Sequence, residues 1–319
     1  MKNVFERISE YGIVPLVTLD DPKDAVPLGR ALLEGGIPIA EVTFRTAAGG
    51  ESIKQMAKEL PDLIVGAGTV HDVEHVKITV DNGGKFVITP GFNHEVVKYC
   101  TDNNIPVCPG TVVPSDIEEA MNLGLSTVKF FPAEAYGGIN TLKALAGPFG
   151  RIKFVPTGGV NLNNLQDYLN LPNVAAVGGS FIPPSKLVKA KDWAGITSLC
   201  HEIMAKVFDF SVARVGLSAP EGEARGISEQ VARIFGRESQ DLGGSYLNCG
   251  LLEVAKGGSG GFVTVRTRDL PRALALFERK GVAVDQGSEK KDEKGQVTSV
   301  SLKDKIGGLE FRLMQCRCH

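Results

Sequence analysis

The feature that most constrains the fold is a regular alternation of short apolar runs with helix-length amphipathic segments between Gly12 and about Val207. Parallel strands need a crossover of helix length between them, so this alternation predicts an α/β fold. Eight strand–helix units in about 200 residues are typical of a (β/α)8 TIM barrel. The expected strands are Ile13–Thr18, Ile39–Thr43, Leu63–Gly66, Phe86–Ile88, Val107–Cys108, Val128–Phe131, Lys153–Val155 and Val174–Val177.

The segments between these strands carry helix-start signals, such as Asp21-Pro22 and Pro114-Ser115. An open doubly wound sheet is the alternative architecture, but it requires a G-x-G-x-x-G turn after the first strand, and Leu19–Pro22 stands there instead. The barrel is therefore favoured. The expected helices are Pro22–Glu34, Glu51–Glu59, Val73–Asn82, His94–Asn103, Ser115–Leu123, Asn161–Leu169 and Trp193–Lys206.

A lysine, Lys129, lies inside the sixth apolar run, Thr127–Phe131. Taken alone, such a lysine is usually a snorkelling residue whose ammonium reaches solvent. If it is held in a pocket instead, desolvation favours the neutral amine, which can attack a carbonyl and form a Schiff base. In a barrel, function sits at the carboxyl ends of the strands. The second strand supplies Glu41 and Arg45. Read together, Lys129 would condense with a keto group, Arg45 would hold a neighbouring carboxylate, and Glu41 would move protons.

Two glycine pairs end the last two expected strands, Gly158-Gly159 and Gly178-Gly179, the second followed by Ser180. Loops at these places in barrels often bind phosphate through backbone amides and a helix N-terminus. The sequence therefore predicts a phosphate site there. The alternating region, Gly12 to about Val207, offers no cluster of His, Asp and Glu placed to hold a metal, because its histidines fall in or beside helical patterns. No metal and no cofactor is expected.

The motifs E-V-T-F-R-T, G-A-G-T-V, I-T-P-G-F, P-G-T, V-K-F-F-P-A-E, P-T-G-G-V and G-G-S occur in this order. This set closely resembles the 2-keto-3-deoxy-6-phosphogluconate (KDPG) and 4-hydroxy-2-oxoglutarate (KHG) aldolases over residues 10–207. The resemblance implies that Lys129 is the Schiff-base lysine and Glu41 the general acid/base. It further implies substrate contacts from Arg45, Thr69, Pro90 and Thr157, and phosphate contacts from Gly158, Gly159, Gly179 and Ser180.

The same resemblance implies a class I aldolase of the Entner–Doudoroff pathway, and a homotrimer. Such an enzyme cleaves KDPG to pyruvate and glyceraldehyde 3-phosphate, and many relatives also cleave 4-hydroxy-2-oxoglutarate to pyruvate and glyoxylate. An aldolase for the galactonate isomer of KDPG remains an alternative. Two others are a non-enzymatic sugar-phosphate sensor and a phosphate-binding barrel epimerase or synthase.

Residues 208–319 show a different pattern. Strand Phe210–Leu217, helix Glu223–Phe235 and short strands through Leu251–Ala255 precede a glycine-rich joint, Gly257–Gly261. The order then repeats with Phe262–Thr267, helix Leu270–Lys280, Val282–Val284, Val297–Leu302 and Leu309–Leu313. Two βαβββ modules in tandem resemble the glyoxalase/vicinal-oxygen-chelate superfamily, whose catalytic members hold a metal. Glu253 and Glu310 stand at plausible ligand positions, but no histidine lies between His201 and His319, so no tight metal site is expected. The role of this domain stays open.

Bulk composition excludes several classes of partner. A net charge of −2 gives no electrostatic case for nucleic acid or an acidic membrane. No apolar run reaches membrane-spanning length, and the N-terminus has no apolar signal segment. The 6 cysteines lack a framework spacing, and the tail Cys316–His319 reads as incidental. Reduced thiols in a cytoplasm are the expectation.

Overall fold

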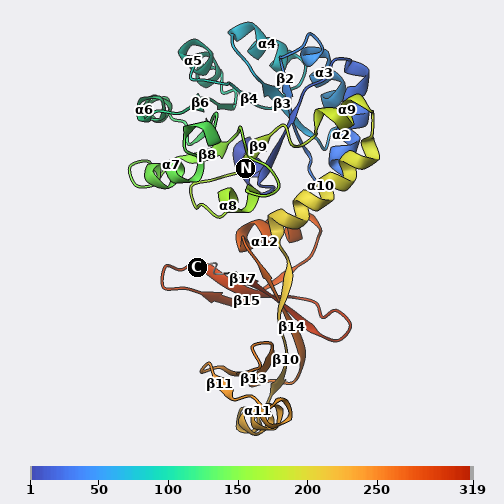
Figure 1. Cartoon of the computed structure of the whole chain (residues 1–319), viewed down its shortest axis with the longest axis vertical. Coiled ribbons are helices and arrows are strands. Elements are labelled where there is room, and N and C mark those ends of the chain that lie inside the picture. Colours follow the sequence, from blue (N-terminus) through green and yellow to red (C-terminus); the bar gives the residue numbers. More distant parts are fainter. Residues whose placement is uncertain (1, 317–319) are drawn as a thin grey trace. The chain divides into compact units, whose positions relative to one another are not determined.

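The computed structural model describes residues 2–316, and the chain divides into two compact units. The first ends at Val207 and the second begins at Phe208. Figure 1 shows helices at the periphery of the parallel strands in the first unit, and a strand-rich second unit.

All paired strands of the first unit run parallel to one another. They form a six-stranded sheet in the order β5-β4-β3-β2-β1-β9 and a three-stranded sheet in the order β6-β7-β8. The strands are β1 Ile13–Val17, β2 Ile39–Thr43, β3 Ile64–Gly68, β4 Val87–Ile88, β5 Val107–Cys108, β6 Gly110–Thr111, β7 Thr127–Phe130, β8 Lys153–Pro156 and β9 Val177–Gly179.

The two sheets are linked at both ends. β5 and β6 are consecutive and separated only by Pro109, which has no N–H for the ladder. At the other junction, Thr157 after β8 forms a parallel bridge with Gly178 of β9. The first unit is therefore a barrel-like α/β unit, as the alternating sequence pattern predicts.

Helices follow most strands, close to the predicted ranges. Asp72 and Asn93 cap two of them by accepting hydrogen bonds from backbone N–H groups in the first turn. The sequence pattern did not predict α1, α7 or α9, which are only 5 to 8 residues long. The helices are α1 Val4–Ser9, η1 Pro22–Asp24, α2 Ala25–Glu34, α3 Gly49–Glu59, α4 Val73–Asp81, α5 His94–Asp102, α6 Pro114–Asn122, η2 Glu134–Tyr136, α7 Gly138–Leu145, α8 Leu165–Leu169, α9 Ser185–Lys189 and α10 Trp193–Phe208.

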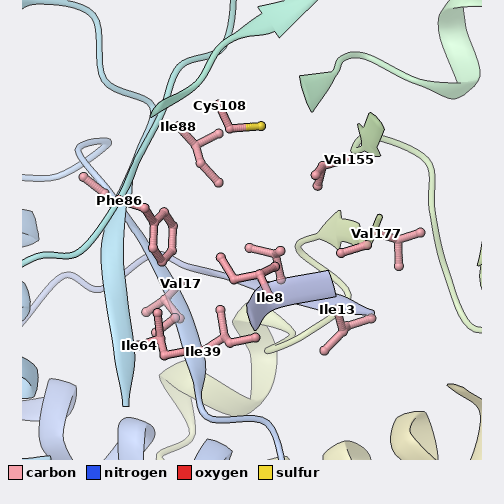
Figure 2. Close-up of a cluster of buried hydrophobic side chains, with 14 of the residues drawn as sticks. Ile8, Ile13, Val17, Ile39, Ile64, Phe86, Ile88, Cys108, Val155 and Val177 are labelled. Atoms are coloured by element: carbon pink, nitrogen blue, oxygen red, sulfur yellow. The ribbon is translucent and has the colours of Figure 1, made fainter. Parts of the chain in front are cut away.

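Apolar side chains fill the space that the parallel strands enclose. In Figure 2, residues such as Ile13, Ile39 and Ile64 come from successive strands and gather with Ile8 of α1. Strand side chains alternate between faces, so Glu41, two residues beyond Ile39, shares the face of Ile39. An apolar layer therefore lies within the barrel beside the ionisable residues at the strand ends.

The second unit contains two copies of the order strand–helix–strand–strand–strand. The first copy is β10 Ser211–Ala219, α11 Glu221–Phe235, β11 Ser239–Asp241, β12 Ser245–Asn248 and β13 Leu252–Lys256. The second is β14 Gly260–Thr267, α12 Leu270–Arg279, β15 Val284–Lys291, β16 Val297–Leu302 and β17 Glu310–Gln315. All eight strands form one sheet in the order β11-β12-β13-β10-β14-β17-β16-β15, and β10 meets β14 antiparallel at the centre.

The core of the second unit is divided between the two copies. Ala219, Ala224 and Val254 form one small buried cluster, and Leu270, Val300 and Leu313 form another. The predicted glycine joint is shorter than expected, because Gly260 and Gly261 belong to β14. No helix in residues 2–316 is both long and apolar enough to cross a membrane.

Candidate active site

The residue pair at the centre of the candidate site is Lys129 of β7 and Glu41 of β2. Lys129 is 4% exposed and Glu41 is 1% exposed, so Lys129 is not a snorkelling residue. The Lys129 Nζ lies 3.5 Å from the Glu41 Oε1. It also lies 5.1 Å from the centroid of the Phe131 ring. A buried ammonium or amine is thus paired with one carboxylate and bordered by an aromatic ring.

Gly68 at the end of β3 makes room for the Glu41 carboxylate. A Cβ at Gly68 would overlap Glu41 Oε1, Cγ and Cδ. Gly68 forms a neighbouring pair with Thr43 in the ladder between β2 and β3. The role of Gly68 was not predicted from the sequence, because it depends on the position of Glu41 on the neighbouring strand.

Burial raises the pKa of Glu41 above its ordinary value of 4.5. The positive charge and hydrogen bond of Lys129 oppose this shift, and the charge of Arg45 opposes it further. Desolvation is the largest of these effects. A carboxyl group with a raised pKa exchanges protons more readily near neutral pH, which suits a general acid/base.

Arg45 and Thr69 follow β2 and β3 at the same end of the strands as Glu41. Because β2 stops at Thr43, Arg45 lies two residues beyond the end of the strand. Its side chain is exposed and makes no ion pair with any residue in the described range 2–316. Thr69 has a φ of +56°, a left-handed conformation that is rare for a β-branched residue and costs about 1–3 kcal/mol. Such strain often marks a functional position.

Pro90 is half-buried and lines a surface hollow of about 290 Å³. Val70, His71, Gly91, Phe92 and Asn93 complete the wall of this hollow. Neither Lys129 nor Glu41 lines it. The hollow begins one residue after Thr69, so it adjoins the strand ends without containing the ionisable pair.

Thr157 and the glycine pair after it form a turn at the end of β8. Thr157 is buried, and Gly158 and Gly159 have φ values of +95° and +86°, which favour glycine. Thr157 and Gly158 accept hydrogen bonds from the Ala133 and Glu134 N–H groups, at 2.8 and 3.1 Å. The turn is therefore held by the segment that follows the strand of Lys129.

The glycine pair does not lead directly into a helix, as the sequence pattern had predicted from Asn161. Helix α8 begins at Leu165. Asn161 and Asn164 side chains both donate to the Gly159 carbonyl, and Asn161 accepts from the Asn163 N–H. Such local bonds compete with helix formation. Any phosphate contact here would come from the turn itself.

Gly179 ends β9, and exposed Ser180 follows it. Gly178, directly before Gly179, bridges to Thr157. The two predicted glycine segments are thus neighbours in space, although 18 residues lie between Gly159 and Gly178 in the sequence.

Residues 2–316 contain no group of three or more His, Cys, Asp or Glu side chains placed to hold a metal ion. In the second unit, Glu253 pairs with Arg214 at 3.1 Å and Glu310 pairs with Arg312 at 2.7 Å. The Arg312 hydrogen bond is the main cause that lowers the pKa of Glu310. Cys318 and His319 lie outside the described residues.

Comparisons with known proteins identify a family for the first part of the chain. A family model described as "Aldolase: KDPG and KHG aldolase" matches residues 4–199. A 2-dehydro-3-deoxy-phosphogluconate aldolase of Haemophilus influenzae is 41% identical over 203 residues, which are 64% of this chain and 96% of that protein. The KHG/KDPG aldolase of Escherichia coli is 40% identical over 60% of this chain and 89% of that protein.

A solved structure adds a chemical observation. The KDPG aldolase of Legionella pneumophila, with pyruvate captured as a covalent carbinolamine intermediate, is 38% identical, with a TM-score of 0.62. The match covers 64% of this chain and 99% of that one. The family model stops at residue 199, so it includes none of the second unit.

Proposed function

Because the chain belongs to the KDPG and KHG aldolase family, we propose that Lys129 is the Schiff-base residue of a class I aldolase with a (β/α)8 barrel. The substrate would be KDPG, and the products pyruvate and glyceraldehyde 3-phosphate. The observation that carries this proposal is the buried Lys129 amine 3.5 Å from the Glu41 carboxylate. The name of the Escherichia coli relative also supports activity on 4-hydroxy-2-oxoglutarate.

The reaction would begin when the Lys129 amine adds to the C2 carbonyl and water leaves, giving an iminium ion. Glu41, directly or through water, would remove the proton of the C4 hydroxyl. The C3–C4 bond then breaks, its electron pair flows into the iminium to give an enamine, and C4 leaves as an aldehyde. Return of the proton to C3 gives the pyruvate imine, and water releases pyruvate from Lys129.

The remaining residues would bind and orient the substrate. Arg45, with its exposed guanidinium free of ion pairs in the described chain, is suited to the C1 carboxylate. Thr69, Pro90 and Thr157 would contact the keto acid. The turn at Gly158-Gly159 with Gly179 and Ser180 would bind the phosphate through backbone N–H groups and a hydroxyl. A homotrimer, a cytoplasmic location and a glyoxalase-like second unit stay predictions.

Trapping with pyruvate and borohydride tests the Schiff base directly. Reduction should fix pyruvate to Lys129 in the wild-type chain, and peptide mass spectrometry should locate it there. Lys129→Arg should take up no pyruvate and lose turnover, because a guanidinium cannot form the imine. Lys153→Arg, at an exposed lysine on β8, is the matched control and should behave as wild type. Pyruvate bound elsewhere, or equally in Lys129→Arg, would refute the proposal.

A further inference from the structure

A buried tyrosine and an exposed glutamate form a pair beside the glycine turn, and the mechanism above does not use it. Tyr168 of α8 is fully buried, and its hydroxyl donates a hydrogen bond to the Glu134 Oε1. Burial and this hydrogen bond raise the pKa of Tyr168, so the hydroxyl stays protonated and remains a donor. A core side chain thus fixes the position of a surface carboxylate.

Two glycines leave room for this pair. A Cβ at Gly138 would lie 2.7 Å from the Tyr168 hydroxyl oxygen and 3.0 Å from the Glu134 Oε1. A Cβ at Gly159 would overlap the Cβ and Cγ of Glu134. The Glu134 side chain therefore packs directly against the backbone of Gly159.

The backbone of Glu134 also contacts the glycine turn. Its N–H donates to the Gly158 carbonyl at 3.1 Å. One residue thus contacts both members of the glycine pair, Gly158 through its backbone and Gly159 through its side chain. Glu134 stands five residues after Lys129, so the contact joins the turn after β8 to the segment after β7.

We propose that Tyr168 and Glu134 are positioning residues that hold the Gly158-Gly159 turn in the shape that accepts the phosphate of the substrate. This inference rests on the proposed function, because it requires the phosphate to bind at that turn. If the pair holds the turn, it helps to determine the preference of the enzyme for phosphorylated over non-phosphorylated keto acids. Lys129 and Glu41 do not contact either residue through any interaction described above, so imine formation should not depend on the pair.

The test compares two substrates in Tyr168→Phe, which keeps the ring and removes only the hydroxyl. The KM for KDPG should rise about two- to tenfold, the effect of losing one hydrogen bond of ordinary net strength, because the lost bond acts on the substrate only through the turn. The KM for 4-hydroxy-2-oxoglutarate, which has no phosphate, and trapping of pyruvate at Lys129 should stay at wild-type values. Tyr136→Phe is the matched control, because Tyr136 is an exposed tyrosine in η2.

Variants of Glu134 keep the test decisive if Tyr168→Phe folds poorly, because Glu134 is exposed. Glu134→Ala should reproduce the selective rise in KM, and Glu134→Gln, which keeps an acceptor oxygen, should largely restore the wild-type value. The double variant Tyr168→Phe/Glu134→Ala should be no worse than either single variant, since both break one interaction. An equal rise for both substrates, or no rise for KDPG, overturns the inference. Absence of pyruvate trapping in the wild type would overturn the proposed function instead.

Discussion

Both units contain acid–base pairs on their strands, but the pairs differ in the chemistry that they allow. Lys129 and Glu41 are almost completely buried, and a lysine amine can lose its proton and become a nucleophile. Arg214–Glu253 and Arg312–Glu310 are partly exposed, and a guanidinium keeps its proton. Opposite charges in contact therefore do not mark a reactive site by themselves. The type of basic side chain and its desolvation decide whether a pair can react.

The contrast extends to the packing around the pairs. The first unit has one large core that buries Lys129 and Glu41 beside apolar strand residues. The second unit has two small clusters, one for each βαβββ copy. A small core leaves strand-borne charges near solvent, where ion pairs contribute little to stability. The predictions below test whether the chemistry is confined to the first unit.

Of the three changes considered next, Glu41→Gln should have the largest effect, because it removes the proposed proton carrier. The kcat should fall about 10²- to 10⁴-fold. Because the carboxylate is the active base and burial raises the pKa of Glu41 above 4.5, the wild-type kcat/KM should decline as pH falls through that raised value. Rate measurements from acid to neutral pH should show this decline in wild type and not in Glu41→Gln. Glu59→Gln, at the end of α3, is the control, and an acidic decline that persists in Glu41→Gln would assign the base elsewhere.

A smaller effect is expected for Arg45→Ala. Loss of a charge-assisted contact to the substrate carboxylate should raise the KM about 10- to 100-fold, with a smaller change in kcat. Steady-state kinetics with KDPG and with 4-hydroxy-2-oxoglutarate should show the rise for both, since both carry the C1 carboxylate. Arg30→Ala on α2, where the guanidinium is also exposed, should leave KM unchanged. A rise for only one substrate would point to a different contact.

The smallest effect is expected from removing the second unit. The Haemophilus influenzae relative is matched over 96% of its length by the first part of this chain, so that part corresponds to nearly a whole protein. A fragment of residues 1–208, which keeps α10 whole, should retain kcat and KM within about twofold, as expected of a domain with its own core. Circular dichroism would establish that the fragment is folded. A folded fragment with much lower turnover would give the second unit a part in catalysis.

The element order and the identity of the central residues could be predicted from the sequence, because apolar periodicity and turn residues act locally. Strands Ile39–Thr43 and Val107–Cys108 occur as predicted, and the last strand of the first unit, Val177–Gly179, starts three residues later than expected. Helix α8 was predicted too long, since the Asn161 and Asn164 side chains bond to the turn instead.

The amino-acid sequence by itself placed a lysine in one apolar strand and a glutamate in another. It also placed glycine pairs at the ends of the last two strands of the first unit. Only the tertiary structure brought Lys129 within 3.5 Å of Glu41, 88 residues away, because β2 and β7 belong to the same barrel-like unit. Burial in that arrangement raises the pKa of Glu41, and no local pattern encodes it. The Tyr168–Glu134 pair and the space at Gly68, Gly138 and Gly159 likewise depend on contacts between distant segments. The sequence therefore determines which side chains the site contains, and tertiary packing determines their distances and their burial.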